Sequence, residues 1–145
     1  MKVFFAGIIQ GSNVRSVIFS QDYREQIKSI MKKRYPDVEI FDPFERHKYS
    51  VDYDIKRARQ VFFMHLEELK SSDLMIAYLP QASLGTAIEM WEAYQNKIPI
   101  ISISPMTANW IIRFLANRNF STMKAFKRFV VENDLQNLLN RGQER

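Results

Sequence analysis

One carboxylate, Glu89, stands near the expected start of a helix, four residues after Gly85. The stretch around it, TAIEMWEAY, is otherwise apolar on one helical face. A carboxylate beside buried surface is costly unless it is paired or takes part in chemistry, so this spacing fits a reactive group at a crevice. An exposed glutamate in a first helical turn, favoured by the helix dipole, fits the same spacing. The residues alone leave both interpretations open.

Two segments combine glycine with small hydroxyl side chains, Gly7 to Ser12 (GIIQGS) and Pro80 to Thr86. Bare amides and hydroxyls at a helix N-terminus form a site for an anion, especially phosphate. The first segment is neither a dinucleotide-binding fingerprint nor a P-loop, because no Gly-Lys-Ser/Thr follows it. A tight strand-to-helix turn also requires glycine for steric reasons. Phosphate binding and plain turn geometry therefore remain alternatives.

The elements that must position these residues alternate along the chain. Short apolar runs predict strands at 2–6, 38–41, 74–79 and 99–103. Amphipathic spacing predicts helices at 22–34, 55–70, 86–95, 109–115 and 121–130, with loops at 44–54 and 80–83. This order predicts an α/β fold, a single-domain doubly wound (flavodoxin/Rossmann-like) parallel sheet of four to five strands flanked by helices. Ligands of such sheets bind at the carboxyl ends of the strands, where both glycine segments and residues 42–44 are expected.

Composition narrows the class of protein. The 145 residues fit one domain, which we expect over 1–132 with a polar C-terminal tail over 133–145. The apolar share of 46% and the charged share of 26% exclude disordered and low-complexity classes. The absence of cysteine excludes disulfides, thiolate metal sites and cysteine nucleophiles. The first apolar run is too short for a secretory leader or a membrane span, so we expect a cytoplasmic protein.

The net charge of +5 favours anionic partners without choosing among nucleic acid, a phosphorylated metabolite and simple solubility. The basic residues are scattered, and those near Arg24 and Lys28 fall on predicted helix surfaces. We therefore expect a solvated basic face rather than a nucleic-acid interface. His47 lies in an irregular segment without companions of metal-ligand type, so no metal and no other cofactor is predicted. Trp91 and Trp110 are expected in the core or in a dimer interface.

The sequence SSDLMIAYLPQASLGTAIEMWEAY, followed by NKIPIISIS, resembles the nucleoside 2-deoxyribosyltransferase superfamily. It is most similar to the branch of nucleoside 5′-monophosphate N-glycosidases. That branch has an Asp that closes a helix, an apolar strand, then S-L-G and a Glu four residues after the Gly. These positions match Asp73, Ser83 to Gly85, and Glu89. The opening VFFAGIIQGS is similar to the family's first strand and glycine loop, and the similarity spans about 2–115 apart from the middle loop.

The resemblance implies a catalytic domain over 1–132 that cleaves N-glycosidic bonds. The glutamate matching Glu89 is the family's nucleophile, which attacks the anomeric carbon, expels the base and leaves a glycosyl-enzyme. Water then gives a free sugar phosphate, whereas a second base gives a new nucleoside. Ser83 matches the nucleotide-specific branch, and a hydroxyl suits a 5′-phosphate that the transferases' Asp would repel. Backbone contacts of further residues would complete the phosphate cradle: Gly7, Gln10, Gly11 and Gly85.

Three further positions follow from the resemblance. Asn109 matches a residue that reaches into the neighbouring subunit's site, which implies a homodimer. His65 stands where the family has the carboxylate that helps to protonate the departing base, and it is either a substitute general acid or a structural residue. Phe4 replaces a Tyr that touches the nucleophile in deoxyribonucleotide-specific members, which leaves room for a 2′-OH. Nearby carboxylates that offer alternative acids are Asp52, Asp54, Glu67 and Glu68.

We therefore predict an N-glycosidase that acts on a ribo- or deoxyribonucleoside 5′-monophosphate, with no nucleic-acid and no membrane partner. Base exchange by the same intermediate is the closest alternative. A nucleotide-binding sensor without turnover is a second alternative, suggested by the replacements at Phe4 and His65, although a pure binding site would not need Glu89. The base is expected to lie against 42–54 and the helix around Val61 and Phe62, and the sequence does not identify it.

Overall fold

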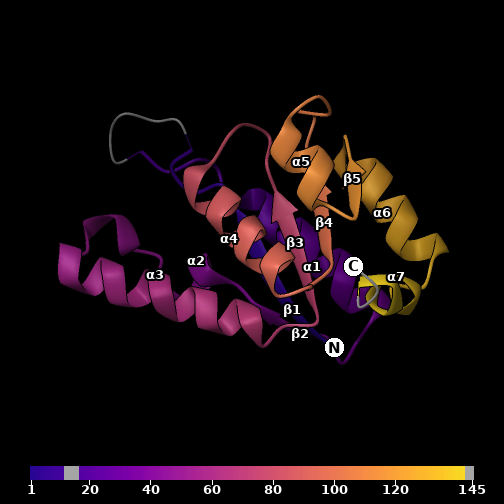
Figure 1. Ribbon diagram of the computed structural model, residues 1–145, viewed down its shortest axis with the longest axis horizontal. Helices are drawn as coiled ribbons and strands as arrows, with labels where there is room; N and C mark the ends of the chain where they lie inside the picture. The colour runs from indigo at the N-terminus through magenta and orange to yellow at the C-terminus, as the bar shows by residue number, and fades with distance from the viewer. Residues whose placement is uncertain (12–16, 143–145) are drawn as a thin grey trace.

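The computed structural model describes residues 1–11 and 17–142. Five parallel strands form one sheet in the order β2-β1-β3-β4-β5. The strands are β1 (Lys2–Gly7), β2 (Glu39–Phe41), β3 (Leu74–Tyr78), β4 (Ile100–Ile103) and β5 (Arg118–Phe120). Helices cover both faces of this sheet, with α4 and α5 in front of it and α1 behind it in Figure 1. The predicted doubly wound α/β sheet is confirmed.

The helices are α1 (Asp22–Arg34), α2 (Pro43–Arg46), α3 (Ile55–Lys70), α4 (Leu84–Gln95), α5 (Trp110–Leu115), α6 (Met123–Glu132) and α7 (Gln136–Gly142). A short 3-10 turn, Ser50–Asp52, precedes α3. None of the helices in the described part of the chain combines the length and the apolar character that a membrane span requires.

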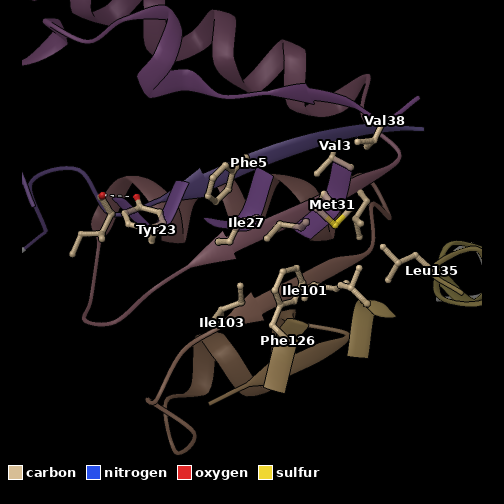
Figure 2. Close-up of a cluster of buried hydrophobic side chains, with 14 residues drawn as sticks. Val3, Phe5, Tyr23, Ile27, Met31, Val38, Ile101, Ile103, Phe126 and Leu135 are labelled. Carbon is tan, nitrogen blue, oxygen red and sulfur yellow. Dashed lines mark hydrogen bonds between the residues drawn. The ribbon is translucent and has the colours of Figure 1, made fainter. Parts of the chain in front are cut away.

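Side chains alternate between two buried layers along the central strands. In β1, Val3 and Phe5 pack toward α1 and α6, whereas Phe4 and Ala6 pack toward α3, α4 and α5. Figure 2 shows the first layer, in which Phe5 lies near Tyr23 and Ile27 of α1. Because helices cover both faces, the strands are apolar throughout, which is why the sequence shows continuous runs rather than alternation.

The strand order places a crevice beside β1. Val3 pairs with Ile40 of β2 on one side and with Leu74 of β3 on the other. The connections on the two sides of β1 run in opposite directions, so the loops that follow β1 and β3 diverge at their carboxyl ends. Gly7 and Tyr78 are register partners at this edge. The crevice lies where the sequence predicted ligand binding.

Some elements begin or end where the sequence did not predict. Strand β5 was missed, because it has only three residues and two of them are polar. The predicted loop 44–54 holds most of α2 and the 3-10 turn. Helix α2 is stabilised by Asp42, whose side chain accepts hydrogen bonds from the N–H groups of Phe44 and Glu45, and by Pro43 at its first position. The residues that favour this short helix are therefore local.

In the segment 133–145, where the sequence predicts a further turn over 134–139 and then a polar tail, the described part contains ordered structure. Leu135 is fully buried in the core between sheet and α1, and its N–H donates to Tyr35 Oη at 3.0 Å. Helix α7 follows directly, with Leu138 and Leu139 packed against the same core. These leucines are the apolar residues of a segment that is otherwise rich in polar side chains.

Candidate active site

A pocket of about 370 Å³ opens at the carboxyl ends of β1 and β3. Its walls come from the loop after β1, the first turns of α4, and the segment from Pro43 into α3. The predicted site residues in its lining are Gly7, Gln10, Gly11, His65, Ser83, Gly85 and Glu89. Phe4 and Asn109 are not part of the lining, and Ser12 lies outside the described residues.

Glu89 projects from α4 into this pocket and is only partly exposed. Burial raises the pKa of its carboxyl to about 8, and the positive charge of Arg24 opposes the rise. The carboxyl group is therefore mostly protonated at pH 7. The glutamate faces the pocket rather than bulk solvent, which separates it from an ordinary first-turn surface residue.

The N-terminal turn of α4 offers backbone donors to the pocket. Ser83 caps the helix and accepts from the Thr86 N–H at 3.5 Å and from the Thr86 hydroxyl at 3.1 Å. The first N–H groups of a helix have no partner within it, so those of Leu84 and Gly85 point out of the helix end. A Cβ placed on Gly85 would meet no atom within 4 Å. The fold does not need glycine there, so its lack of a side chain leaves the backbone open to a ligand.

The fold itself requires glycine at positions 7 and 11. A Cβ on Gly7 would lie 2.5 Å from the hydroxyl of Tyr23, which donates to the Ile8 carbonyl at 2.8 Å. Gly11 has a φ of +59°, and its Cβ would lie 2.6 Å from Gln81 Nε2. Turn geometry and packing therefore account for these two glycines, whereas they do not account for Gly85.

Arg24 also lines the pocket, and the sequence analysis missed it. The expectation of a solvated helix surface is wrong for Arg24 and Lys28, which are 3% and 8% exposed. Both lie on the face of α1 that carries Ile27 and Met31, because residues three and four apart share a helical face. This spacing was the available signal that the two cations point inward.

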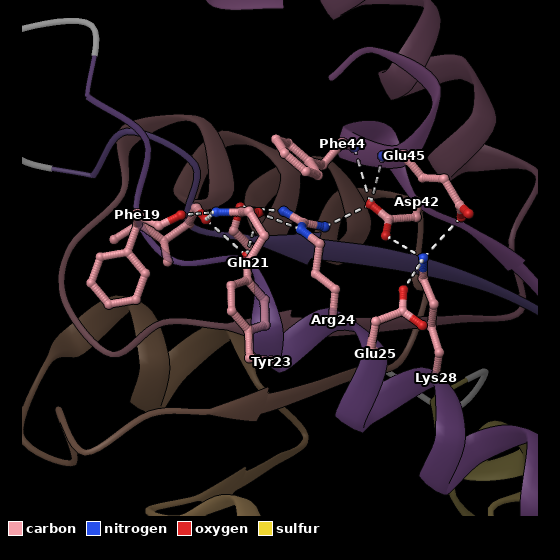
Figure 3. Close-up of polar contacts among 11 residues, drawn as sticks. Phe19, Gln21, Tyr23, Arg24, Glu25, Lys28, Asp42, Phe44 and Glu45 are labelled. Carbon is pink, nitrogen blue, oxygen red and sulfur yellow. Dashed lines mark hydrogen bonds and ion pairs between the residues drawn. The ribbon is translucent and has the colours of Figure 1, made fainter. Parts of the chain in front are cut away.

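Hydrogen bonds hold the Arg24 guanidinium on three sides, as Figure 3 shows. It donates to Gln21 Oε1 at 2.6 Å, to Asp42 Oδ1 at 2.7 Å and to the Gly7 carbonyl at 3.2 Å. The other oxygen of Asp42 lies 2.9 Å from Lys28 Nζ. The cluster joins α1 to the ends of β1 and β2, and it fixes one wall of the pocket.

His65 lies in the pocket wall on α3, with its ring 5.7 Å from Phe41 and 5.3 Å from His47 between centroids. Burial and the neighbouring His47 lower the pKa of His65 to about 4. The imidazole is therefore neutral at pH 7, and its buried Nε2 has no hydrogen-bond partner among the described residues. It can offer a neutral donor or acceptor, but not the positive charge of an imidazolium acid.

The alternative acids lie outside the pocket lining. Glu68 pairs with Lys2 at 2.8 Å, and Asp54 caps α3 through the Arg57 N–H. Within the described residues, Glu89 is the one carboxylate of the lining. The remaining wall is apolar and aromatic, formed by Pro43, Val51, Tyr53, Ala58, Val61 and Phe62. Such a surface suits a planar heteroaromatic ring.

Four further residues that the sequence singled out do not line the pocket of a single chain. Phe4 is fully buried and stacks on Phe41 at 5.5 Å in the core. Asn109 is exposed and caps α5, accepting from the N–H groups of Ile111 and Ile112. Trp91 and Trp110 are 50% and 71% exposed, so neither belongs to the core, and neither lines the pocket.

No protein-family model and no curated protein matches this chain. Several solved structures are similar to it. A 2-deoxyribosyltransferase from Bacillus psychrosaccharolyticus is similar over 95% of this chain and 96% of its own, with a TM-score of 0.68 and 18% identity. The CMP N-glycosidase BcmB of Clostridium botulinum is similar over 88% and 95%, with a TM-score of 0.55 and 17% identity. BlsM is similar over 97% and 88%, with a TM-score of 0.58 and 15% identity.

The first two of these structures are of the two kinds of protein that the sequence resembles, a deoxyribosyltransferase and a nucleotide N-glycosidase. The likeness covers nearly the whole chain, including the strands that carry the pocket. The chain therefore has the nucleoside deoxyribosyltransferase-like fold.

Proposed function

We propose that this protein is an N-glycosidase that cleaves a nucleoside 5′-monophosphate into a free base and a sugar 5-phosphate, with Glu89 as the nucleophile. The observation that carries the proposal is the position of Glu89 in one pocket between the open first turn of α4 and an aromatic wall. The similar structures of a 2-deoxyribosyltransferase and a CMP N-glycosidase support chemistry at a glycosidic bond.

The two sides of the pocket suit the two ends of a nucleotide. The phosphate would be bound by the Ser83 hydroxyl and by backbone N–H groups at Gly85, where the helix dipole favours an anion. The base would lie against the aromatic wall around Tyr53 and Phe62. The anomeric carbon then falls between these ends, on the side of the pocket that carries Glu89.

In the first step a Glu89 carboxylate oxygen bonds to the anomeric carbon, and the carbon–nitrogen bond breaks with its electron pair passing to the base. The base then takes up a proton from water, and we assign the neutral His65 as a residue that hydrogen-bonds the base without giving up a proton. In the second step water attacks the same carbon, one of its protons is lost to solvent, and the Glu89 carboxylate is released. The nucleophile must be ionised, so the reaction should accelerate as the pH rises through about 8.

A second copy of the chain is part of the proposal. Helices α4 and α5 are in contact, and each exposes one pair of aromatic side chains, Trp91 with Tyr94 on α4 and Trp110 with Phe114 on α5, which together we call the aromatic patch. An apolar patch of this kind suits a partner surface. We assign it to a homodimer in which Asn109, beside the patch, reaches the partner's pocket.

Base release from a panel of ribo- and deoxyribonucleoside 5′-monophosphates tests the proposal, with chromatography as the readout. We expect release from at least one nucleotide, none from the matching nucleoside, and loss in Glu89→Gln. Glu92→Gln is the matched control, because Glu92 lies on α4 but pairs with Lys70 outside the pocket. No release from any nucleotide would overturn the proposal.

A nucleotide-binding sensor is the second candidate, favoured by one observation: Glu89 is the single carboxylate in the described lining, whereas glycosidases use two. Nucleotides that raise the melting temperature without release of base would support it. A labelled free base added to the assay separates base exchange from hydrolysis, because only exchange places the label in a nucleotide.

A further inference from the structure

The charge balance inside the pocket rests on two side chains. Within the described lining, Glu89 of α4 is the one acidic side chain and Arg24 of α1 is the one permanent cation. The other titratable groups of the lining are His65 from α3 and Tyr53 from the segment before it, and β1 contributes uncharged residues. Burial makes an ionised Glu89 costly, and Arg24 is the group whose charge lowers the pKa of Glu89.

The guanidinium of Arg24 cannot move away from this position easily. Besides its three hydrogen bonds, it lies 5.1 Å from the ring centroids of Phe5 and Tyr23 and 5.3 Å from that of Phe44. An arginine stays protonated in proteins, so its charge does not depend on pH in the working range. A fixed, permanent cation therefore faces the pocket.

The buried part of the cluster behind Arg24 holds two cations and one carboxylate. Arg24 and Lys28 share the single buried carboxylate of Asp42, at 2.7 and 2.9 Å. The other partners of Lys28, Glu25 and Glu45, are 81% and 62% exposed, so solvent screens their negative charges. Because Asp42 is shared between two cations, it orients Arg24 without cancelling the positive charge of the buried part of the cluster.

We propose that Arg24, held in the wall of the same pocket by Asp42, is a positioning residue that increases the fraction of Glu89 in its carboxylate form while a negatively charged substrate occupies the pocket. The inference rests on the proposed function. A phosphate beside the pocket would add negative charge next to Glu89, and burial would favour the protonated acid further. Arg24 offsets both effects from α1 without a contact to the reacting atoms.

The test uses two variants. Arg24→Gln removes the positive charge, and Arg24→Lys keeps the charge but cannot form all three hydrogen bonds of the guanidinium. Carbon-13 NMR of glutamate-labelled protein follows the Glu89 carboxyl, assigned by its loss in Glu89→Gln. We expect a midpoint at about pH 8 in the wild type. The midpoint should rise by about one pH unit in Arg24→Gln, and by less in Arg24→Lys. This readout needs no turnover.

The pH profile of base release gives the second readout. If Arg24 sets the ionisation of Glu89, kcat/KM of Arg24→Gln should fall about tenfold at pH 7 and approach the wild-type value above the new midpoint. A merely structural role would lower the rate by the same factor at every pH. Lys28→Gln is the matched control, since Lys28 belongs to the same cluster but does not line the pocket, and its profile should stay close to the wild type.

Each outcome supports or overturns either the role of Arg24 or the proposed glycosidase activity. An unchanged Glu89 midpoint in folded Arg24→Gln overturns the role of Arg24. If Arg24→Gln does not fold, Arg24→Lys replaces it in the test. A Glu89 midpoint equal to the wild-type value in Arg24→Lys overturns the claim that the hydrogen-bonded guanidinium sets the ionisation of Glu89. Midpoints that shift as expected in a protein that releases no base leave the Arg24 effect standing and overturn the glycosidase.

Discussion

Arg24 Nη1 lies 2.7 Å from Asp42 Oδ1, and only 4% and 1% of the two side chains are exposed. The pair joins the first turn of α1 to the residue that follows β2. Through the Gly7 carbonyl, Arg24 also holds the end of β1. A buried ion pair, and not apolar packing alone, therefore sets the distance between the loops that form the pocket.

Removal of one partner of this ion pair should lower the stability of the folded protein. Asp42→Ala leaves the buried Arg24 without an ion-pair partner, takes the one buried partner from Lys28 and removes the cap of α2, so we expect the free energy of unfolding to fall by about 3–5 kcal/mol. Urea unfolding at pH 7 measures it. Glu45→Ala is the control, because that carboxylate is largely exposed, and its cost should be about 0–1 kcal/mol. Equal losses in the two variants would contradict the assignment.

Glu89 should make stability depend on pH. Its folded pKa of about 8 lies above the ordinary value of 4.5, so the folded state holds the proton more strongly than the unfolded chain. The resulting stabilisation is complete below about pH 4.5 and is lost as the pH rises through about 8. Relative to Glu89→Gln, the wild type should lose at most about 1.4 kcal/mol per pH unit in this window. Parallel stability curves of the two proteins would exclude the raised pKa.

His65 should titrate far below an ordinary histidine. Its pKa of about 4 lies below the usual 6.5, so its stabilising effect is present above about pH 6.5 and is lost as the pH falls through about 4. Proton NMR of the imidazole ring gives the midpoint directly. His47→Gln should raise that midpoint, because the charge of His47 contributes to the lowering. A midpoint above 6 in the wild type would restore His65 as a charged acid.

Gly85 and Gly11 should respond in opposite ways to an added methyl group. Gly85→Ala places a Cβ in open space on a helix, so stability should rise by about 0.5–1 kcal/mol while nucleotide binding weakens. Gly11→Ala forces alanine into a positive φ against Gln81, so stability should fall. Thermal unfolding with and without a nucleoside 5′-monophosphate measures both effects. Unchanged binding by Gly85→Ala would remove the first turn of α4 from the site.

The exposed aromatic patch should control the oligomeric state. Trp110→Glu and Phe114→Glu should convert a dimer to a monomer in sedimentation experiments, because a buried unpaired charge opposes association. Val131→Glu, on exposed α6, is the matched control. Asn109→Asp keeps the cap of α5, so a loss of base release in that variant would report a contact across the interface. A monomeric wild type would contradict the homodimer.

The sequence predicted the sheet and the place of Glu89 for the same reason. Parallel strands end at one edge, and the helix that carries Glu89 begins there after Ser83. The apolar runs of β1 and β3 are long enough to be unambiguous. Strand β5 gave no such signal, because its pairing with β4 depends on distant residues and not on its own composition.

Arg24 was missed because charge was taken as a sign of exposure. Its burial depends on Asp42, which is 18 positions away in the chain, so the pair is visible only after folding. The roles of Phe4 and Asn109 came from the resemblance alone. The structure places both residues outside the pocket lining of a single chain. Neither the type nor the spacing of these residues had indicated a place in the pocket.

The position of β1 between β2 and β3 has a consequence for folding. Gly7 and Ser83 both line the pocket, although they belong to opposite halves of the chain. Parallel pairing across such separations is slow, since loop closure must precede the contacts that reward it. An intermediate that lacks the β1–β3 ladder cannot bind a nucleotide at this pocket. Ligand present during refolding should therefore trap the native state by mass action and leave the early steps unaffected.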